Sequence, residues 1–238
     1  MTAIDTAAAV EIVDLASTPL RELNQRLHDR AGNEPQPRSW RVLNPNGAHA
    51  VACGLDAPLD VEILGHVGYY CAGMNKRATV RVRGNAGTGL AENIISGAVI
   101  VGGNASQSAG ATGRGGLVVV HGDAAARCGI SMKGVDIVVR GAVGHMSAFM
   151  AQRGRLVVCG DAGEALGDSI YETHIYVRGE VASLGADCTE KELRPHHVAE
   201  LRSLLEQAGF TDLDPSEFRR YGSARRLYNF HIDHAGSY

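Results

Sequence analysis

The chain repeats one short pattern in which two apolar residues alternate with variable ones and a glycine ends the unit. The final glycine returns every nineteen residues, without insertion or deletion, at Gly65, Gly84, Gly103, Gly122, Gly141, Gly160 and Gly179. Such alternation places both apolar side chains on one face of a short strand. Nineteen residues are too few for a strand and a crossover helix, so each repeat is predicted to be one coil of a solenoid. Seven coils stacked at about 4.8 Å would form a rod roughly 30 Å long.

Small residues hold two further positions of the repeat. The third and seventh residues after each final glycine are only Gly, Ala or Ser. Small side chains let neighbouring corners approach, and glycine also adopts the positive φ of tight bends. The pattern predicts an all-β fold, a right-handed parallel β-helix of about seven 19-residue coils. Leucine-rich repeats and left-handed hexapeptide helices fit less well, because the leucine pattern is absent and nineteen is not a multiple of six.

Two segments outside the repeat have helical patterns, and a solenoid needs its open ends covered. Residues 18–30 combine Thr18 as N-cap with Pro19 at the first helical position and a leucine stripe. Residues 195–208 carry a second apolar stripe and stop at Gly209. We therefore predict short N- and C-terminal flanking helices as candidate caps.

These patterns divide the chain into three parts. Residues 1–40 form an N-terminal flanking segment with a helix, 41–190 the β-helix with clean repeats over 61–188, and 191–238 a C-terminal helix with a docking tail. Trp40, Val42 and Leu43 are candidates for an imperfect coil ahead of the clean ones. The tail is rich in arginine and aromatic residues, which are enriched in protein contacts, so we expect it to lie on a surface of this chain or of a partner. Its candidate contact residues are Arg225, Arg226, Tyr228 and Phe230.

Composition narrows the class of protein. Apolar residues make up 45% of the 238-residue chain and the net charge is −3, without the dense Lys/Arg runs of a nucleic-acid surface. We find no signal peptide and no apolar run of membrane-spanning length, which predicts a cytoplasmic protein. Five cysteines without a C-x-x-C pair predict reduced and mostly buried thiols.

Candidate catalytic residues are few. Asp161, Glu164 and Asp168 share one corner and could pair for acid–base chemistry, although acids at solenoid corners more commonly face solvent. His231 and His234 could be half of a metal site, but no third ligand is in view. We assign no catalytic, cofactor-binding or metal-binding residue to this chain, and give the seven final glycines a structural role.

Two other polar groups stand out. The adjacent His196 and His197 should point apart on a helix. Four arginines take outward positions of their strands and could meet either solvent or an acidic partner surface: Arg81, Arg83, Arg140 and Arg178.

The repeat resembles the C-terminal β-helix domain of the glutamate synthase large subunit, the GXGXG family. Its G-x-x-G-x-x-x-G signature is complete at Gly160, Gly163 and Gly167. The stretches GHVGYYCAGMNK (65–76), ASQSAGATGRGG (105–116), CGISMKGVDIVVRG (128–141) and SARRLYNFHID (223–233) are similar to the free-standing glutamate synthase-like subunits of N-methylglutamate synthase, also called methylamine–glutamate N-methyltransferase. The likeness covers nearly the whole chain.

That resemblance implies a division of labour. The complex would convert methylamine and L-glutamate to N-methyl-L-glutamate and ammonia. A glutamine amidotransferase-like subunit and an FMN-binding synthase-like subunit with an iron–sulfur cluster would be the partners of this non-catalytic subunit, which would hold no cofactor. The alternatives are the equivalent subunit of a glutamate synthase or of a formylmethanofuran dehydrogenase-type complex. A stand-alone polysaccharide-cleaving β-helix fits less well, because the repeats admit no inserted loop that could build a cleft.

Overall fold

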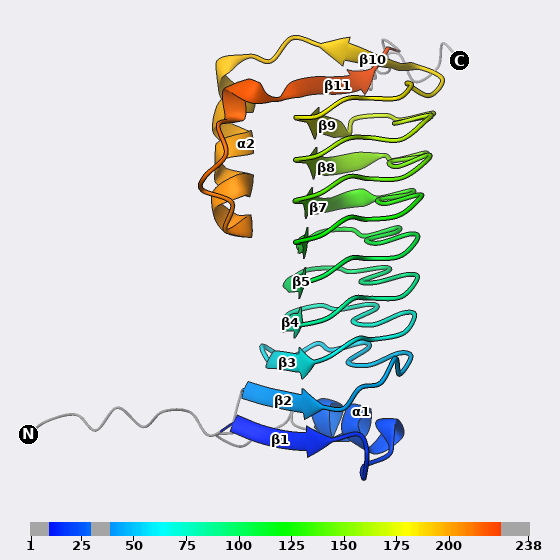
Figure 1. Cartoon of the computed structure of the whole chain (residues 1–238), viewed down its shortest axis with the longest axis vertical. Coiled ribbons are helices and arrows are strands. Elements are labelled where there is room, and N and C mark those ends of the chain that lie inside the picture. Colours follow the sequence, from blue (N-terminus) through cyan, green and yellow to red (C-terminus); the bar gives the residue numbers. More distant parts are fainter. Residues whose placement is uncertain (1–9, 30–38, 225–238) are drawn as a thin grey trace, which may run out of the picture.

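The computed structural model of the chain describes residues 10–29 and 39–224, which form a tall stack of coils (Figure 1). One 11-stranded sheet runs along it in the order β1-β2-β3-β4-β5-β6-β7-β8-β9-β11-β10. Its strands are β1 (Val10–Asp14), β2 (Ser39–Leu43), β3 (Asp60–Leu64), β4 (Thr79–Val82), β5 (Ala98–Val101), β6 (Leu117–Val120), β7 (Lys133–Val139), β8 (Arg153–Val158), β9 (His174–Val177), β10 (Cys188–Lys191) and β11 (Arg219–Ser223). The helices are α1 (Leu20–Asp29), α2 (Pro195–Ala208) and the 3-10 turn η1 (Pro215–Glu217).

Strands β3 to β9 pair in parallel and confirm the seven coils of the β-helix. Each strand faces the next with the register of the repeat, so that Val61 pairs with Val80 and Val80 with Val99. The two inward positions of every strand are buried and form two apolar ladders inside the coils. The alternating pattern therefore indicates both the strands and the face that they bury.

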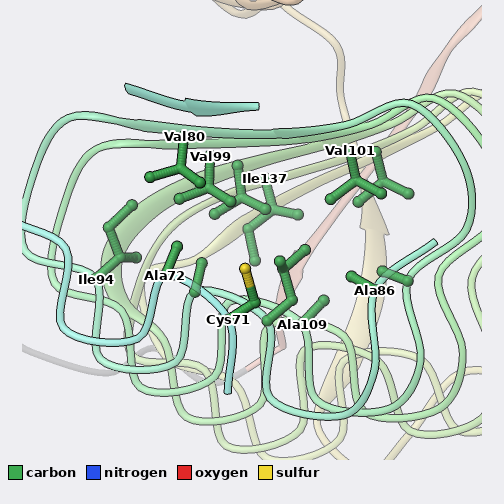
Figure 2. Packing of buried hydrophobic residues seen from close by; sticks show 14 of the residues in the cluster. Cys71, Ala72, Val80, Ala86, Ile94, Val99, Val101, Ala109 and Ile137 are labelled. Atoms are coloured by element: carbon green, nitrogen blue, oxygen red, sulfur yellow. The ribbon is translucent and has the colours of Figure 1, made fainter. Parts of the chain in front are cut away.

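The opposite wall of each coil supplies a third ladder of small residues. Isolated parallel bridges join equivalent positions two residues after the final glycine, beginning with Val67, Ala86 and Ala105. In Figure 2 the row of Val80, Val99 and Ile137 faces a wall that carries smaller residues such as Ala72. Valine, isoleucine and leucine on the sheet side and alanine or valine on the other keep the interior narrow and filled, as close packing requires.

The small residues seven positions after the final glycine occupy the left-handed backbone region. In six of the seven coils their φ lies between 52° and 69°, as at Ala72 and Gly110. The residues two before and two after them are left-handed too, for example Tyr70 and Met74. The amides of these left-handed residues bond alternately to the following and the preceding coil. Tyr70 N donates to Thr88 O of the following coil, and Ala72 N donates to Val51 O of the preceding coil. Positive φ is costly for branched side chains, which explains the small residues.

Helix α1 covers the N-terminal end of the stack, as predicted. Strand β1 is an additional strand at this end that the repeat does not indicate. Leu23 and Leu27 of α1 are fully buried in the interior cluster. Asn24 fixes the helix to the first arch through 2.9 Å bonds with Ala50 O and Ala52 N. The predicted imperfect coil is β2, and β1 pairs with β2 outside it. Strand β1 was not anticipated because Val10–Asp14 lacks the final glycine.

The C-terminal helix does not cap the stack, which corrects that part of the prediction. Residues 195–208 are helical as expected and end at Gly209 with φ of 80°. Figure 1 shows α2 beside the coils at the level of β7 to β9, while β10 and β11 cross the end. Strand β11 pairs antiparallel with both β9 and β10. The helix is held at the side because the outward positions of the neighbouring strands are apolar there.

Part of the predicted tail is therefore a strand of the sheet. Phe218 and Tyr221 are each only 3% exposed, and Tyr221 pairs with Ile175 of β9. This part of the tail lies on the chain's own surface. The candidate contact residues Arg225, Arg226, Tyr228 and Phe230 lie outside the described residues. Neither helix that the structure describes has the length and apolarity needed to cross a lipid bilayer.

Candidate functional site

The corner glycines lie where successive coils come closest. A Cβ added to Gly160 would lie 2.7 Å from the carbonyl carbon of Gly141, and one added to Gly84 would lie 2.6 Å from that of Gly65. Real Cβ atoms do not approach backbone so closely, so any side chain here would push the coils apart. Apart from Gly65, these seven glycines have no left-handed φ. Close approach, rather than backbone freedom, therefore requires glycine at this corner.

Five of the seven final glycines are followed by a residue whose side chain accepts a hydrogen bond from the backbone of the next coil, a ladder that sequence reasoning missed. Asn85 Oδ1 accepts from Asn104 N at 2.8 Å, and Asn104 Oδ1 accepts from Asp123 N at 2.9 Å. Asp123 and Asp161 accept in the same way from Ala142 and Glu180. The signal is present in the sequence as Asn or Asp at positions 85, 104, 123 and 161, separated by the repeat length or twice it.

The three acids of the Gly160 corner do not form an acid–base pair. Asp161 accepts from Glu180 N, while Asp168 accepts from Ser169 Oγ at 2.7 Å and from Ala186 N at 3.2 Å. Both aspartates thus brace the backbone of the last coils. No side-chain hydrogen bond or ion pair joins Glu164 to another described residue.

The outward arginines meet acids of their own chain, an outcome that was not among the two expected. Arg140 makes two hydrogen bonds to Asp212, at 2.8 and 2.6 Å, and its guanidinium lies 5.1 Å from the Phe210 ring centroid. Arg178 bonds Glu217 at 2.6 Å. In the first coils the partners are different: Arg81 pairs with Asp60, and Arg83 pairs with Glu62. Two of the four arginines therefore fasten the C-terminal segment to the sheet.

A polar cluster joins α2 to β7, β8 and β9 around the carboxylate of Glu200. The Tyr176 hydroxyl donates to this carboxylate at 2.6 Å. His174 Nδ1 lies 3.1 Å from it and Arg155 Nε 3.0 Å. Arg155 also donates to both oxygens of Asp136 at 3.1 Å. One arginine and one glutamate thus link three strands to the helix.

The electrostatics of this cluster oppose a role in proton transfer. Burial raises the pKa of Glu200, but hydrogen bonds from Tyr176 and His174 and the charge of Arg155 outweigh it and lower that pKa to about 2. Burial and the neighbouring Glu200 raise the pKa of Tyr176 far above its ordinary value. A carboxylate this acidic beside a phenol this weak cannot exchange protons efficiently near neutral pH. The arrangement is that of a fixed structural network.

The two adjacent histidines do not point apart, which corrects the sequence prediction. The ring centroids of His196 and His197 lie only 3.9 Å apart in the first turn of α2, although His197 is buried and His196 is exposed. His197 is 5% exposed, and its Nδ1 accepts from Arg194 N at 3.1 Å. Burial, with the charge of Arg220 adding to it, lowers the pKa of His197 to about 4.

A cleft of about 450 Å³ opens beside the polar cluster of Glu200, at the edge of the sheet where the chain enters strands β6 to β9. Its charged lining residues are Arg114, Lys133, Arg153, Arg155, Glu172, His174 and Glu200. An adjoining cleft of about 630 Å³ shares Lys133, Arg153 and Glu172 and adds Met150 and Tyr171. This cleft was not predicted from the sequence, because α2 must be in position before the cleft has its second wall.

The cations of the cleft come from consecutive coils. Arg114 and Lys133 are nineteen residues apart, and Lys133 lies beside Arg153 across an irregular register. All three are exposed, and none makes a side-chain hydrogen bond or ion pair with another residue in the described part of the chain. Arg114 and Lys133 hold the same position of the repeat and Arg153 stands one position later, so the nineteen-residue period alone does not mark all three.

Thiol and metal chemistry gain no support from the described residues. All five cysteines are free, and three of them are buried, as expected. Burial raises the pKa of Cys128 and of Cys159 to about 12, so neither is a thiolate nucleophile. Within residues 10–29 and 39–224 no three His, Cys, Asp or Glu side chains are placed to hold a metal ion. His231 and His234 lie outside the described residues.

Comparison with known proteins gives one close relative and no family model. The chain is 61% identical over 229 residues to a protein of Rhizobium meliloti (strain 1021) named Protein GlxC, and the match covers 95% of this chain and 99% of that protein. No protein-family model matches the chain. Identity at this level over nearly the full length of both chains means that they share the whole fold, including the flanks.

Proposed function

Because this chain belongs to the same protein family as Protein GlxC, we propose a single role for that family: a non-catalytic β-helix subunit of a multi-subunit glutamate synthase-like enzyme. The observation that carries the proposal is the uninterrupted stack of seven coils, with the G-x-x-G-x-x-x-G signature complete at the Gly160 corner and its later glycines partly replaced by Ala or Ser at the other corners. Its glycines are needed for contact between coils, so the signature describes a rigid scaffold rather than a phosphate-binding loop.

The most specific form of the proposal is N-methylglutamate synthase. That enzyme would transfer the methylamine nitrogen into L-glutamate, releasing ammonia and giving N-methyl-L-glutamate. The sequence likeness that favours it includes residues 65–76 and 105–116, which form arches on the side of the coils opposite the sheet. The FMN and the iron–sulfur cluster would reside in a synthase-like partner subunit, and the glutaminase-like fold in another.

The polar residues of this chain support a scaffold better than an active site. Glu200, Arg155 and Asp136 hold one another in fixed ion pairs, and the corner aspartates bond backbone amides. These contacts stabilise the stack and the docked helix.

Co-expression with the products of neighbouring genes tests the proposal. We expect this chain to co-elute in size exclusion with a yellow or brown flavoprotein, and to lack activity alone. The complex should form N-methylglutamate from methylamine and glutamate, whereas glutamate formation from glutamine and 2-oxoglutarate would favour the glutamate synthase alternative. A monomer that binds none of these proteins and cleaves polysaccharides would contradict the proposal.

A further inference from the structure

We propose that the basic cleft beside α2 is the docking site for an acidic, partly apolar segment of a partner protein. The cleft has two adjoining parts, of about 450 and 630 Å³, which share Lys133, Arg153 and Glu172. The inference rests on the proposed function in one respect, since it assumes that the chain works as a subunit beside other proteins.

Unbalanced positive charge is the first reason. Arg114, Lys133 and Arg153 occupy consecutive coils, so their backbones are spaced by about 4.8 Å per coil along the stack. Cations held this close repel one another, and none of the three has an acidic partner among the described residues. An anionic chain laid along the stack would neutralise all three.

The acids near the cleft do not supply that neutralisation. Glu200 is already engaged by Arg155, His174 and Tyr176, and Asp136 is engaged by Arg155. Glu172 lines both parts of the cleft but forms no ion pair with the cations around it in the described structure. The lining therefore keeps an excess of positive charge where a ligand would lie.

Apolar surface beside the cations favours a protein segment over a small inorganic anion. Met150, with 47% of its surface exposed, and Tyr171 line the wider part of the cleft. Arginine, tyrosine and methionine are enriched at protein interfaces, where aromatic and flexible apolar side chains cover a partner's apolar residues. Inorganic phosphate would pair with the cations but leave the apolar surface of Met150 and Tyr171 exposed to water.

Other occupants fit the charge less well. Residues 225–238 of this chain follow β11, but they contain Arg225 and Arg226 and only one acid, Asp233. A nucleic acid needs a long basic track, whereas these three cations cover only about 10 Å. An acidic peptide needs only the short track that is present.

Peptide binding to the isolated chain tests the proposal. The probe is a short fluorescent peptide of Glu, Leu and Ser, and the variant is Lys133→Glu with Arg153→Glu. The matched control is Lys76→Glu with Arg127→Glu, which makes the same charge change at two exposed cations outside the cleft. We expect the cleft variant to weaken binding by about tenfold or more and the control to change it by less than about twofold. Lys133→Gln with Arg153→Gln should give an intermediate loss while retaining the fold.

Three outcomes would overturn the docking site. They are equal affinity of the cleft variant and its control, no measurable binding of the acidic peptide, and binding of inorganic phosphate or a DNA oligonucleotide that displaces the peptide at lower concentration.

The same variants separate this inference from the proposed function. If the flavoprotein complex forms equally well with Lys133→Glu and Arg153→Glu, the docking site is wrong and the scaffold role stands. If the unmodified chain joins no complex and the peptide still binds with the expected charge dependence, the cleft stands and the scaffold role fails.

Discussion

The two halves of the sheet have the same interior and opposite exteriors. Every strand from β2 to β9 buries two apolar residues inside the coil. The single outward residue between them is charged on the early strands, at Arg41, Glu62 and Arg81, and apolar on the later ones, at Val119, Val138 and Val157. We call these the open half and the covered half, because α2 packs only on the second.

This difference shows that the inward and outward residues of a repeat have separate structural roles. The inward ladders set the coil and do not change along the stack, whereas the outward residue determines what lies on the face. In the open half Arg41 and Arg83 share Glu62 at the surface. In the covered half Leu201, Leu204 and Leu205 of α2 close over the valines and leave each nearly unexposed. A solenoid can thus carry a helix on one stretch without altering its coils.

The largest effect should follow from a charge in the covered half. Val157→Asp would bury a carboxylate under α2 without a partner, and we expect the free energy of unfolding to fall by about 4 kcal/mol. Arg81→Val, the reverse exchange at the equivalent outward position of the open half, should change it by less than about 0.5 kcal/mol. Urea unfolding monitored by circular dichroism measures both. Similar losses for the two variants would remove the distinction between the halves.

Corner glycines should matter equally in both halves. Gly84→Ala and Gly160→Ala each place a Cβ within 2.7 Å of the preceding coil, so each should cost about 3 kcal/mol. Gly209→Ala is the control, since nothing lies within 4 Å and only its left-handed φ of 80° is strained, at a cost of about 1 kcal/mol. Thermal and urea unfolding measure these losses. A loss of stability in Gly160→Ala alone would contradict the expectation that the corner glycines matter equally in both halves.

Acid should weaken the covered half first. The pKa of His197 is about 4 in the fold and about 6.5 when unfolded, so its neutral form stabilises the fold fully above pH 6.5. That contribution, about 3 kcal/mol, is lost as the pH falls from about 6.5 to about 4. His197→Gln should flatten the stability profile over this interval. A wild-type profile that is already flat there would contradict the assignment.

The smallest difference concerns the surface ion pairs. Arg140→Ala removes two hydrogen bonds to Asp212 and the contact with Phe210, and should cost about 1 kcal/mol. Arg83→Ala in the open half removes an ion pair with Glu62 whose arginine is more exposed, at 61% against 35% for Arg140, and should cost about 0.3 kcal/mol. High salt should shrink the electrostatic part of both losses. An equal cost for the two arginines would show that Asp212 does not fasten the C-terminal segment.

Much of the fold could be predicted because its signals are local. The glycine period located the coils, and the alternation of Val80 and Val82 identified their buried face. The helix of residues 195–208 was predicted with its observed bounds, since a proline at its start and Gly209 after its end are both adjacent to it. The regular Asn and Asp positions of the corner ladder were also readable, although they were overlooked.

The candidate site was harder to predict because it depends on distant residues. Lys133 and Glu200 line one cleft, but strands β8, β9 and β10 lie between them in the sequence. Arg140 finds Asp212, and Tyr176 finds Glu200, only when α2 lies beside the sheet. None of these pairs has a fixed spacing in sequence, so no periodic pattern reveals them.

The sequence by itself determined the coil, since a repeat of nineteen with two inward apolar residues and a crowded glycine permits one way of stacking. Only the tertiary structure decided where α2 lies, how β11 enters the sheet between β9 and β10, and which charges remain unpaired. The physical reason is that coil stacking is a contact between neighbouring repeats, whereas the position of α2 depends on the outward residues of several strands acting together.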